Sequence, residues 1–308
     1  MVMKTEIAAP EEIYFSARDG LRLHARHYPA RGSRGFNRRP VLCLPGLTRN
    51  GRDFHDLAVA LSSSSFEARD VYTFDYRGRG LSQFDPDWRN YAVPIEMLDV
   101  LDVITVAGLE SVAVIGTSRG GLIAHLLAAA RPAVMGALVL NDIGPVVERA
   151  GLARISAYVG RVPLPGSWAD AAKLVRDLNK RAFPAVSDQD WETIARQWYN
   201  EVKGRPAPGY DSKLANSLSV LDGPMPTLWP QFEALRKIPL LVLRGENSDI
   251  LSKETVDEMR RRHSQFSALT VPQQGHAPLL KDAPTITAIH RFLEAVDAGQ
   301  SLPERAIA

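Results

Sequence analysis

Apolar residues along the chain gather in short runs rich in valine, leucine and isoleucine, and these runs alternate with longer stretches of helical apolar spacing. The alternation is typical of α/β proteins, in which a mostly parallel sheet is flanked by helices. Segments 12–17 and 21–28, joined by an Arg-Asp-Gly turn, are predicted to form an antiparallel hairpin. The buried strands expected after it span 41–44, 71–75, 112–116, 137–141, 240–244 and 268–271.

Helical spacing is found between most of these strands. An apolar stripe covers 98–107, and the alanine-rich segment 122–130 is apolar on most sides, as expected of a buried helix. Further helices are predicted over 254–263 and 285–296.

The series of strands is interrupted over residues 145–235. This stretch predicts four or five helices and no strand, at 147–159, 168–183, 190–202, 211–221 and 228–235, and it holds four of the five tryptophans. We interpret it as a helical cap inserted over the carboxyl edge of the sheet. The predicted organisation is therefore a core domain of residues 1–144 and 236–308 with a cap domain of residues 145–235.

Composition and charge narrow the classes of partner and the location expected for the protein. The net charge of +2, with 45% hydrophobic and 23% charged residues, is ordinary for a soluble globular protein and favours neither nucleic acid nor a membrane as a partner. The arginines between Arg18 and Arg39 are interpreted as part of a solvated loop around Gly32, Ser33 and Gly35. Residues 1–10 carry no apolar stretch of signal-peptide type, so a cytoplasmic location is expected.

The strongest chemical signal is the sequence Gly-Thr-Ser-Arg-Gly at 116–120. A predicted buried strand runs directly into it, and a predicted buried helix follows at once. A serine in such a sharp strand-to-helix turn projects its hydroxyl away from the backbone, and glycines at 116 and 120 remove side chains that would collide across the turn. This context predicts that Ser118 is a nucleophile.

The motifs together resemble the α/β-hydrolase family, of the serine esterase and carbon–carbon hydrolase type with a helical cap. Leu-Pro-Gly at 44–46, Asp-Tyr-Arg-Gly-Arg-Gly-Leu-Ser at 75–82, the serine turn, an acid and a histidine occur in the family's order. The resemblance covers nearly the whole chain. It implies the α/β-hydrolase fold and a catalytic triad of serine, acid and histidine.

Among the seven histidines, His276 matches the family's base. It follows the last predicted strand in Gln-Gln-Gly-His-Ala-Pro at 273–278. A neutral imidazole there can accept the proton of Ser118 and pass it to the leaving group. His125, in the helix after the nucleophile, is interpreted as a packed residue.

Two aspartates compete for the third position of the triad. Asp249 follows the penultimate strand and fits the family's order of serine, acid and histidine, so it is the preferred acid. Asp142, at the end of the preceding strand, is the alternative, because some members of the fold place the acid there.

The resemblance also implies an oxyanion hole made by the backbone N–H groups of Leu47 and Arg119. At the first of these the chain departs from the family, because Pro45-Gly46 replaces the usual His-Gly. The missing histidine has no catalytic role, so hydrolysis is expected to survive. The segment 75–82 is interpreted as structural.

These residues predict a carboxylesterase-like serine hydrolase that cleaves a small-to-medium ester and needs no cofactor or metal, since the sequence holds no phosphate loop and no metal-binding motif. Arg49, Trp168 and Trp198 are candidate substrate-binding residues. A lactonase or carbon–carbon bond hydrolase with the same triad stays open, as does a small-molecule-binding protein without catalysis. Cys43, in an apolar run, is interpreted as a core residue, and the sequence predicts no oligomeric state.

Overall fold

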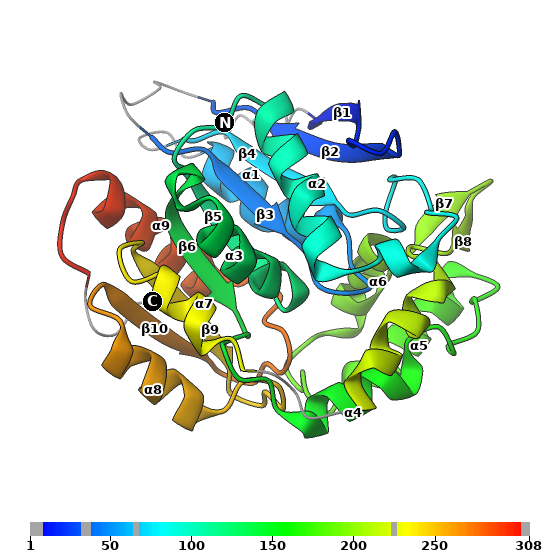
Figure 1. Ribbon diagram of the computed structural model, residues 1–308. Helices are drawn as coiled ribbons and strands as arrows, with labels where there is room; N and C mark the ends of the chain where they lie inside the picture. The colour runs from blue at the N-terminus through cyan, green and yellow to red at the C-terminus, as the bar shows by residue number, and fades with distance from the viewer. Residues whose placement is uncertain (1–8, 32–37, 64–67, 223–226, 303–308) are drawn as a thin grey trace, which may run out of the picture.

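The computed structural model describes residues 9–31, 38–63, 68–222 and 227–302, without the side chains of 219–222. Its centre is an eight-stranded sheet in the order β1-β2-β4-β3-β5-β6-β9-β10 (Figure 1). β2 pairs antiparallel with both of its neighbours, whereas the remaining pairs are parallel. The strands are β1 (Glu11–Ser16), β2 (Arg22–Tyr28), β3 (Val41–Leu44), β4 (Val71–Asp75), β5 (Val112–Thr117), β6 (Met135–Asn141), β9 (Leu240–Gly245) and β10 (Phe266–Val271).

Helices cover both faces of this sheet because successive side chains of each strand point to opposite sides. In β3, Leu42 and Leu44 belong to one core cluster, and Val41 and Cys43 belong to another. Besides residues from the segment between β6 and β9, the first cluster includes residues of α2 (Val93–Val106), α3 (Arg119–Ala130) and α8 (Lys253–Arg262). The second includes residues of two helices, α1 (His55–Ser63) and α9 (Ala283–Asp297).

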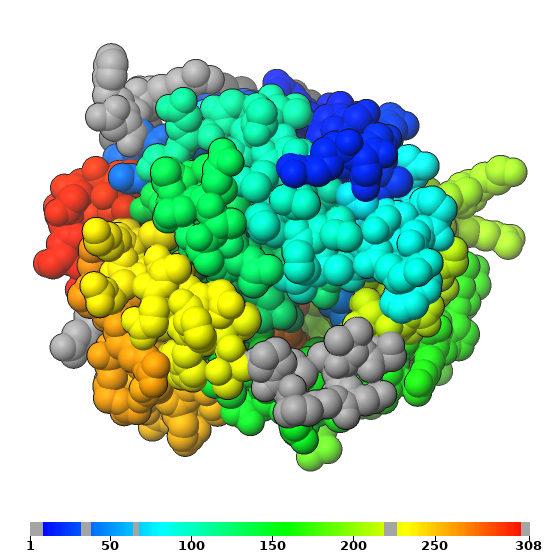
Figure 2. Space-filling model, viewed as in Figure 1, coloured from blue at the N-terminus to red at the C-terminus, as the bar shows by residue number. Residues whose placement is uncertain are grey.

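Most elements of the segment between β6 and β9 lie at the lower right of Figure 1, whereas its last helix, α7 (Trp229–Ala234), lies beside α3 and places Phe232 in the first core cluster. Figure 2 shows a hollow between part of this segment and the cyan surface of the core. The elements are α4 (Arg149–Tyr158), α5 (Trp168–Asn179), α6 (Asp188–Trp198), β7 (Asn200–Val202), β8 (Arg205–Ala207), the 3₁₀ helix η4 (Ser212–Asp222) and α7 (Trp229–Ala234).

Side chains of the core hold this segment in place. Asn50, after β3, donates its amide to the carbonyl of Gln197 at 2.9 Å, and the guanidinium of Arg52 donates to the carbonyls of Gln197 and Tyr199 at 3.1 Å. The segment has a small core of its own, comprising Ala171, Val175, Phe183, Trp191, Ile194 and Ala195.

The prediction that this segment contains no strand is wrong. β7 and β8 pair as an antiparallel hairpin across Lys203 and Gly204, which have φ values of 51° and 75°. Two consecutive residues of positive φ make the tight turn that suits the twist of a hairpin. The helix α1 was not predicted either. It begins with His55 and Asp56, and its buried apolar residues are Leu57, Ala58 and Leu61.

The strands of the main sheet agree with the predicted ones to within about two residues. The loop residues Gly32, Ser33 and Gly35, and most of the amino-terminal stretch 1–10, lie outside the described residues. Within the described ranges, none of the helices has both the length and the apolar character needed to cross a bilayer.

Close backbone contact at the turn after β5 explains its glycines. A methyl group on Gly116 would lie 2.7 Å from the backbone of Gly120, and one on Gly120 would lie 2.1 Å from the carbonyl oxygen of Leu44. The turn and the start of α3 can therefore press against β3 only because both positions lack a side chain.

We predict that Gly120→Ala destabilises the fold, because the new methyl group meets a backbone atom that cannot rotate away. A cost of about 1–3 kcal/mol is typical of overpacking. Gly166→Ala is the matched control, since a methyl group there would lie 3.8 Å from its nearest neighbour, Asp170. Urea unfolding of both variants measures the difference. Equal stability of the two would contradict the packing argument.

Candidate active site

Ser118 lies between the last residue of β5 and the first residue of α3. Its φ of 51° and ψ of −112° place it in a strained backbone conformation that a non-glycine residue seldom adopts. The turn is fixed by backbone hydrogen bonds, because the N–H of Ser118 donates to Asn141 at 3.1 Å and its carbonyl accepts from Gly121 at 2.9 Å. The predicted strand–turn–helix context of Ser118 is therefore present.

His276 reaches Ser118 from the loop after β10. Its Nε2 lies 2.8 Å from Ser118 Oγ, and its Nδ1 lies 2.8 Å from Asp142 Oδ2. The ring is nearly buried, with 7% of the side chain exposed. The histidine predicted from sequence thus lies against the serine predicted from sequence.

Asp142 follows β6 directly and also has a positive φ, of 57°. Its side chain is fully buried and accepts hydrogen bonds from the N–H of Gly245 at 2.8 Å and from Ser248 Oγ at 2.6 Å, besides the contact with His276. These donors satisfy the buried carboxylate. An ionised carboxylate only accepts hydrogen bonds, and each of these contacts offers it a donor.

Asp249, the acid preferred from sequence, does not contact His276. Its two carboxylate oxygens accept from Arg154 Nε and Nη2 at 2.6 and 2.8 Å, and this hydrogen bonding lowers the pKa of Asp249. The preference is corrected, since the alternative, Asp142, occupies the position beside His276. The physical reason is that Asp249 points toward α4, whereas Asp142 points along the strand ends toward the base.

This arrangement determines where the protons lie. A carboxylate at Asp142 can only accept, so Nδ1 of His276 carries the ring proton and Nε2 presents a lone pair to the hydroxyl of Ser118. The three groups therefore form one hydrogen-bonded chain in which the histidine can accept the serine proton and Asp142 can stabilise the imidazolium that results.

The turn after β3 places Gly46 and Leu47 beside this chain, where both line a cavity together with Ser118 and His276. The carbonyl of Leu47 accepts from the guanidinium of Arg79 at 2.8 Å, and the N–H of Arg49 donates to Gly46 at 3.1 Å. Arg119 is the first residue of α3, so its backbone N–H is among those that the helix leaves without an internal acceptor.

Glu96 links the two predicted oxyanion residues from below. Its fully buried carboxylate accepts from Arg79 Nη1 at 2.6 Å and from Arg119 Nε at 2.5 Å. Burial alone would raise the pKa of Glu96, but the guanidiniums of Arg119 and Arg79 outweigh it and hold that pKa below its ordinary value. Glu96 thus binds Arg119 directly, and it is linked to Leu47 through Arg79. No motif or spacing in the sequence singled out Glu96 as a site residue.

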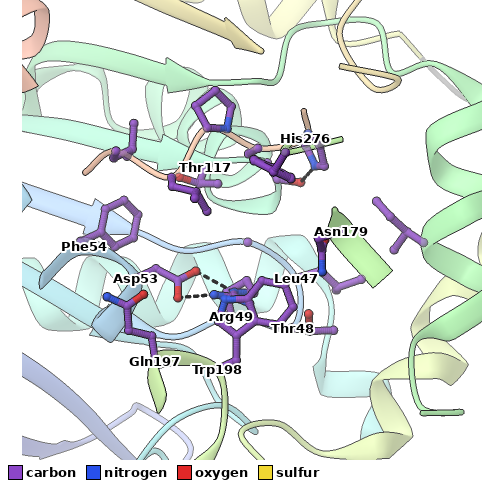
Figure 3. A pocket seen from close by; sticks show the side chains of 18 of the residues that line it. Leu47, Thr48, Arg49, Asp53, Phe54, Thr117, Asn179, Gln197, Trp198 and His276 are labelled. Carbon is purple, nitrogen blue, oxygen red and sulfur yellow. Dashed lines mark hydrogen bonds and ion pairs between the residues drawn. The ribbon is translucent and has the colours of Figure 1, made fainter. Parts of the chain in front are cut away.

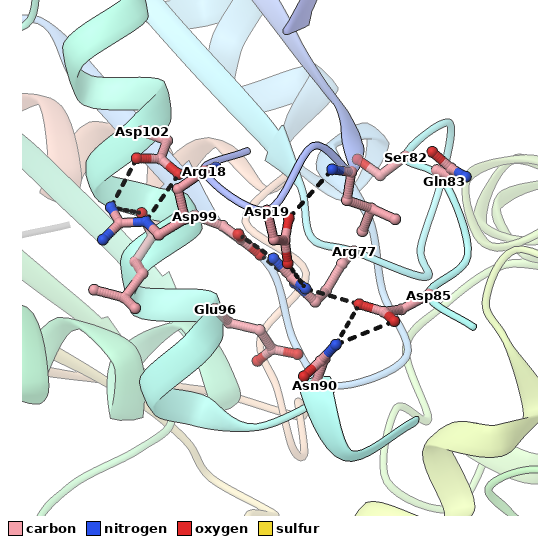
Figure 4. Close-up of polar contacts among 12 residues, drawn as sticks. Arg18, Asp19, Arg77, Ser82, Gln83, Asp85, Asn90, Glu96, Asp99 and Asp102 are labelled. Atoms are coloured by element: carbon pink, nitrogen blue, oxygen red, sulfur yellow. Dashed lines mark hydrogen bonds and ion pairs between the residues drawn. The ribbon is translucent and has the colours of Figure 1, made fainter. Parts of the chain in front are cut away.

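Arg77, in the same turn as Arg79, holds a second group of carboxylates in place (Figure 4). It donates to Asp99 at 2.7 and 2.6 Å and to Asp19 and Asp85 at 2.8 Å. Asp75, at the start of the turn, accepts from the backbone N–H groups of Gly51 and Leu81. These contacts agree with the structural interpretation of segment 75–82.

The cavity beside Ser118 has a volume of about 120 Å³ and is lined mainly by apolar groups, including Phe54, Phe183 and Trp191. Arg49 and Trp198 line it too, with the guanidinium of Arg49 over the Trp198 ring at 3.4 Å from its centre (Figure 3). Trp168 is not among its lining residues. The indole N–H of Trp168 donates to the carbonyl of Gly204 at 3.1 Å, which directs that ring toward the β7–β8 hairpin.

The remaining candidate groups have structural surroundings. Nδ1 of His125 lies 2.7 Å from the carbonyl of Gly121, and burial lowers the pKa of His125 to about 4. Cys43 is buried in β3, and that burial raises the pKa of its thiol. Among the described side chains, no three histidine, cysteine or carboxylate groups gather in a way that could hold a metal ion.

Comparison with known proteins places this fold and site in a family. The sequence model of the alpha/beta hydrolase family matches residues 41–288, so the chain belongs to that family. The resemblance and the fold predicted from the motifs are thereby confirmed.

Individual relatives agree with this placement. The chain is 32% identical to a 3-hydroxybutyrate-oligomer hydrolase of Cupriavidus necator over 83% of this chain and 88% of the relative. It is 30% identical to an sn-1-specific diacylglycerol lipase of Mus musculus over 77% and 74% of the two chains. A crystal structure of an alpha/beta hydrolase from Novosphingobium aromaticivorans superposes with a TM-score of 0.85 at 41% identity, covering 93% of this chain and 99% of the other.

We predict that Asp142→Asn lowers kcat by roughly 10⁴-fold, because an amide beside Nδ1 no longer favours the tautomer that leaves Nε2 free to accept. Asp249→Asn is the matched control. It removes only a partly exposed ion pair with Arg154 and is expected to keep kcat within about threefold. The kcat of each variant is measured with a 4-nitrophenyl ester at steady state. A larger loss of kcat in Asp249→Asn than in Asp142→Asn would restore Asp249 as the acid of the triad.

We further predict that Glu96→Gln lowers kcat by roughly tenfold while KM changes little, because Arg79 and Arg119 lose the carboxylate that binds them both. A smaller effect than the roughly 10²–10³-fold loss of a whole oxyanion donor is expected because both backbone N–H groups stay in the chain. Asp102→Asn, on the same helix, removes only a pair with the exposed Arg18 and serves as the control. A Glu96→Gln enzyme with the kcat of the control would show that the link has no catalytic effect.

Proposed function

We propose that this protein hydrolyses carboxylic esters through an acyl-enzyme intermediate on Ser118. The observation that carries the proposal is the hydrogen-bonded chain of Ser118, His276 and Asp142 at the wall of an apolar cavity. Relatives whose names describe ester hydrolysis, among them the oligomer hydrolase and the lipase, support the same reaction class.

In the first half of the reaction, His276 takes the proton of Ser118 as Oγ attacks the ester carbonyl carbon. The carbonyl oxygen becomes an oxyanion and is held by the backbone N–H groups of Leu47 and Arg119, each worth about 3 kcal/mol of barrier by analogy with measured donors. His276 then gives its proton to the departing alcohol oxygen. The products of this half are the free alcohol and an ester of Ser118.

The second half repeats these steps with water as the nucleophile. His276 takes a proton from water, the resulting hydroxide attacks the acyl carbon, and the oxyanion forms again in the same place. When the intermediate collapses, the proton returns to Ser118 Oγ and a carboxylic acid leaves. No cofactor is needed, since every proton moves between the substrate, water and these side chains.

Substrate size is expected to follow from the segment at residues 145–235, which we propose acts as a cap. It contributes Tyr158, Phe183, Trp191 and Trp198 to the cavity beside Ser118. With about 120 Å³ enclosed by mostly apolar groups, the site suits a small or medium ester rather than a long-chain lipid. Hydroxy-acid esters of the kind named for the Cupriavidus necator relative are consistent with this size.

The decisive variant is Ser118→Ala. We expect loss of roughly 10⁶-fold in kcat on 4-nitrophenyl butyrate, because Ser118 Oγ is the hydroxyl that His276 contacts and can deprotonate. A fluorophosphonate probe is expected to label the parent protein and not the variant, with circular dichroism confirming that both are folded.

Unchanged turnover in Ser118→Ala would refute the proposal. A folded parent protein that neither labels nor turns over esters would favour the alternative of a binding protein without catalysis. A parent protein that labels, yet prefers lactones or dienoic diketo acids to simple esters, would redirect the assignment to the lactonase or carbon–carbon hydrolase alternative.

A further inference from the structure

A second cavity, of about 250 Å³, lies next to the one that holds Ser118 and His276. Four residues line both cavities, namely Thr48, Arg49, Tyr158 and Trp198. The two spaces are therefore separated only by this small set of residues. The second cavity does not touch the triad, so the reaction steps described above leave it without a role.

Arg49 is the residue that connects this wall to the reacting centre. A methyl group in place of the Gly46 hydrogen would lie 3.3 Å from Arg49 Cγ and 3.8 Å from Ser118 Cβ, so the stem of Arg49 starts beside the nucleophile. Its guanidinium extends over Trp198, as Figure 3 shows. The charge of Arg49 is thus held between the two cavities.

The hydrogen bonds of this guanidinium are incomplete. Asp53 accepts from Nε at 2.7 Å and from Nη2 at 2.5 Å, on one edge of the group. Nη1, on the other edge, is buried and has no hydrogen-bond partner among the described residues. A buried donor on a charged group without an acceptor costs free energy, and a carboxylate is the acceptor whose geometry suits a guanidinium edge.

Polarity and charge of the second cavity agree with such a ligand. Among the residues that the structure describes, Arg49 is the one charged residue that lines it, and Asp53 lines only the first cavity. The hydroxyl-bearing residues Tyr158, Tyr199, Tyr210 and Ser212 are accompanied by aliphatic ones, Val162, Leu164, Val175 and Leu178. The lining therefore combines one cation with surfaces that suit short branched hydrocarbon.

We propose that the second cavity is a subsite for the carboxylate-bearing alcohol portion of the ester and that Arg49 is the specificity-determining residue that holds its carboxylate. The inference rests on the proposed ester hydrolysis at Ser118 and narrows its substrate to esters of hydroxy acids with a free carboxyl group. The carboxylate meets Nη1 of Arg49 when the side chains of the shared wall move apart to admit it.

The test compares two substrates with the same scissile ester, the linear dimer of 3-hydroxybutyrate and the carboxy-terminal amide of that dimer. Only the first carries the charge. Products are measured by liquid chromatography with mass detection, and kcat and KM are determined separately. The parent enzyme is expected to favour the acid over the amide by about 10- to 100-fold in kcat/KM, mainly through KM, as expected for one charged hydrogen-bonding contact.

Substitutions at Arg49 and at Leu178 distinguish recognition of the substrate carboxylate by Arg49 from a structural role of Arg49 in its own loop. Arg49→Gln is expected to bring the acid-to-amide ratio to about one, and Arg49→Lys to retain part of it, because lysine keeps the charge but loses the planar fork. Leu178→Trp enlarges a side chain in the wall of the second cavity and leaves Arg49 itself unchanged. It is expected to lower kcat/KM for the dimer relative to 4-nitrophenyl acetate by about tenfold.

The possible results are distinct. Equal kcat/KM of the parent enzyme for the acid and the amide would overturn the inference and make Arg49 a structural residue. The same conclusion would follow if Arg49→Gln lowered hydrolysis of the acid and of the amide in equal proportion while Leu178→Trp left both unchanged. In either case labelling of Ser118 and turnover of 4-nitrophenyl esters would still stand. Absence of labelling and of all ester turnover in the folded parent would instead refute the proposed function itself.

Discussion

The buried carboxylate of Asp142 is the point at which three segments of the active-site edge meet. It accepts from Gly245 at the end of β9, from Ser248 in the following loop and from His276 after β10. A charge in the interior persists only when hydrogen bonds compensate its lost hydration, so these donors must stay close to it. The same constraint sets the tautomer of His276 and therefore the direction of the hydrogen bond with Ser118.

Glu96 is a second buried carboxylate near Ser118, because it binds Arg119, the residue that follows the serine. Glu96 accepts from the guanidiniums of Arg79 and Arg119, and Arg79 also holds the carbonyl of Leu47. Two cations and one anion in the core are costly to desolvate, but removing one partner would leave an uncompensated charge. These contacts hold the two residues whose N–H groups are the proposed oxyanion donors, and donors that are in place before an oxyanion forms lower the barrier because they need no reorganisation.

Local sequence patterns were sufficient to predict the sheet and the serine turn, because each depends on neighbouring residues: an apolar run or a pair of glycines. His276 was singled out by its resemblance to the family's motif, and its Nε2 lies 2.8 Å from Ser118 Oγ. Local patterns failed where contacts between residues far apart in the sequence determine the position of a side chain. Asp249 follows a strand end as a triad acid should, but Arg154, nearly a hundred positions earlier, binds it. Glu96 left a signal that could have been used, since a carboxylate lies on the buried face of α2 with Val100, Val103 and Ile104.

The most direct test of this account is the ring N–H proton of His276, observed by proton NMR of protein labelled with ¹⁵N-histidine. A hydrogen bond from Nδ1 to a buried carboxylate shifts this proton far downfield. We expect the resonance in the parent protein and in Asp249→Asn, and its loss in Asp142→Asn. A downfield resonance that persists in Asp142→Asn and disappears in Asp249→Asn would contradict the arrangement on which the proposed mechanism depends.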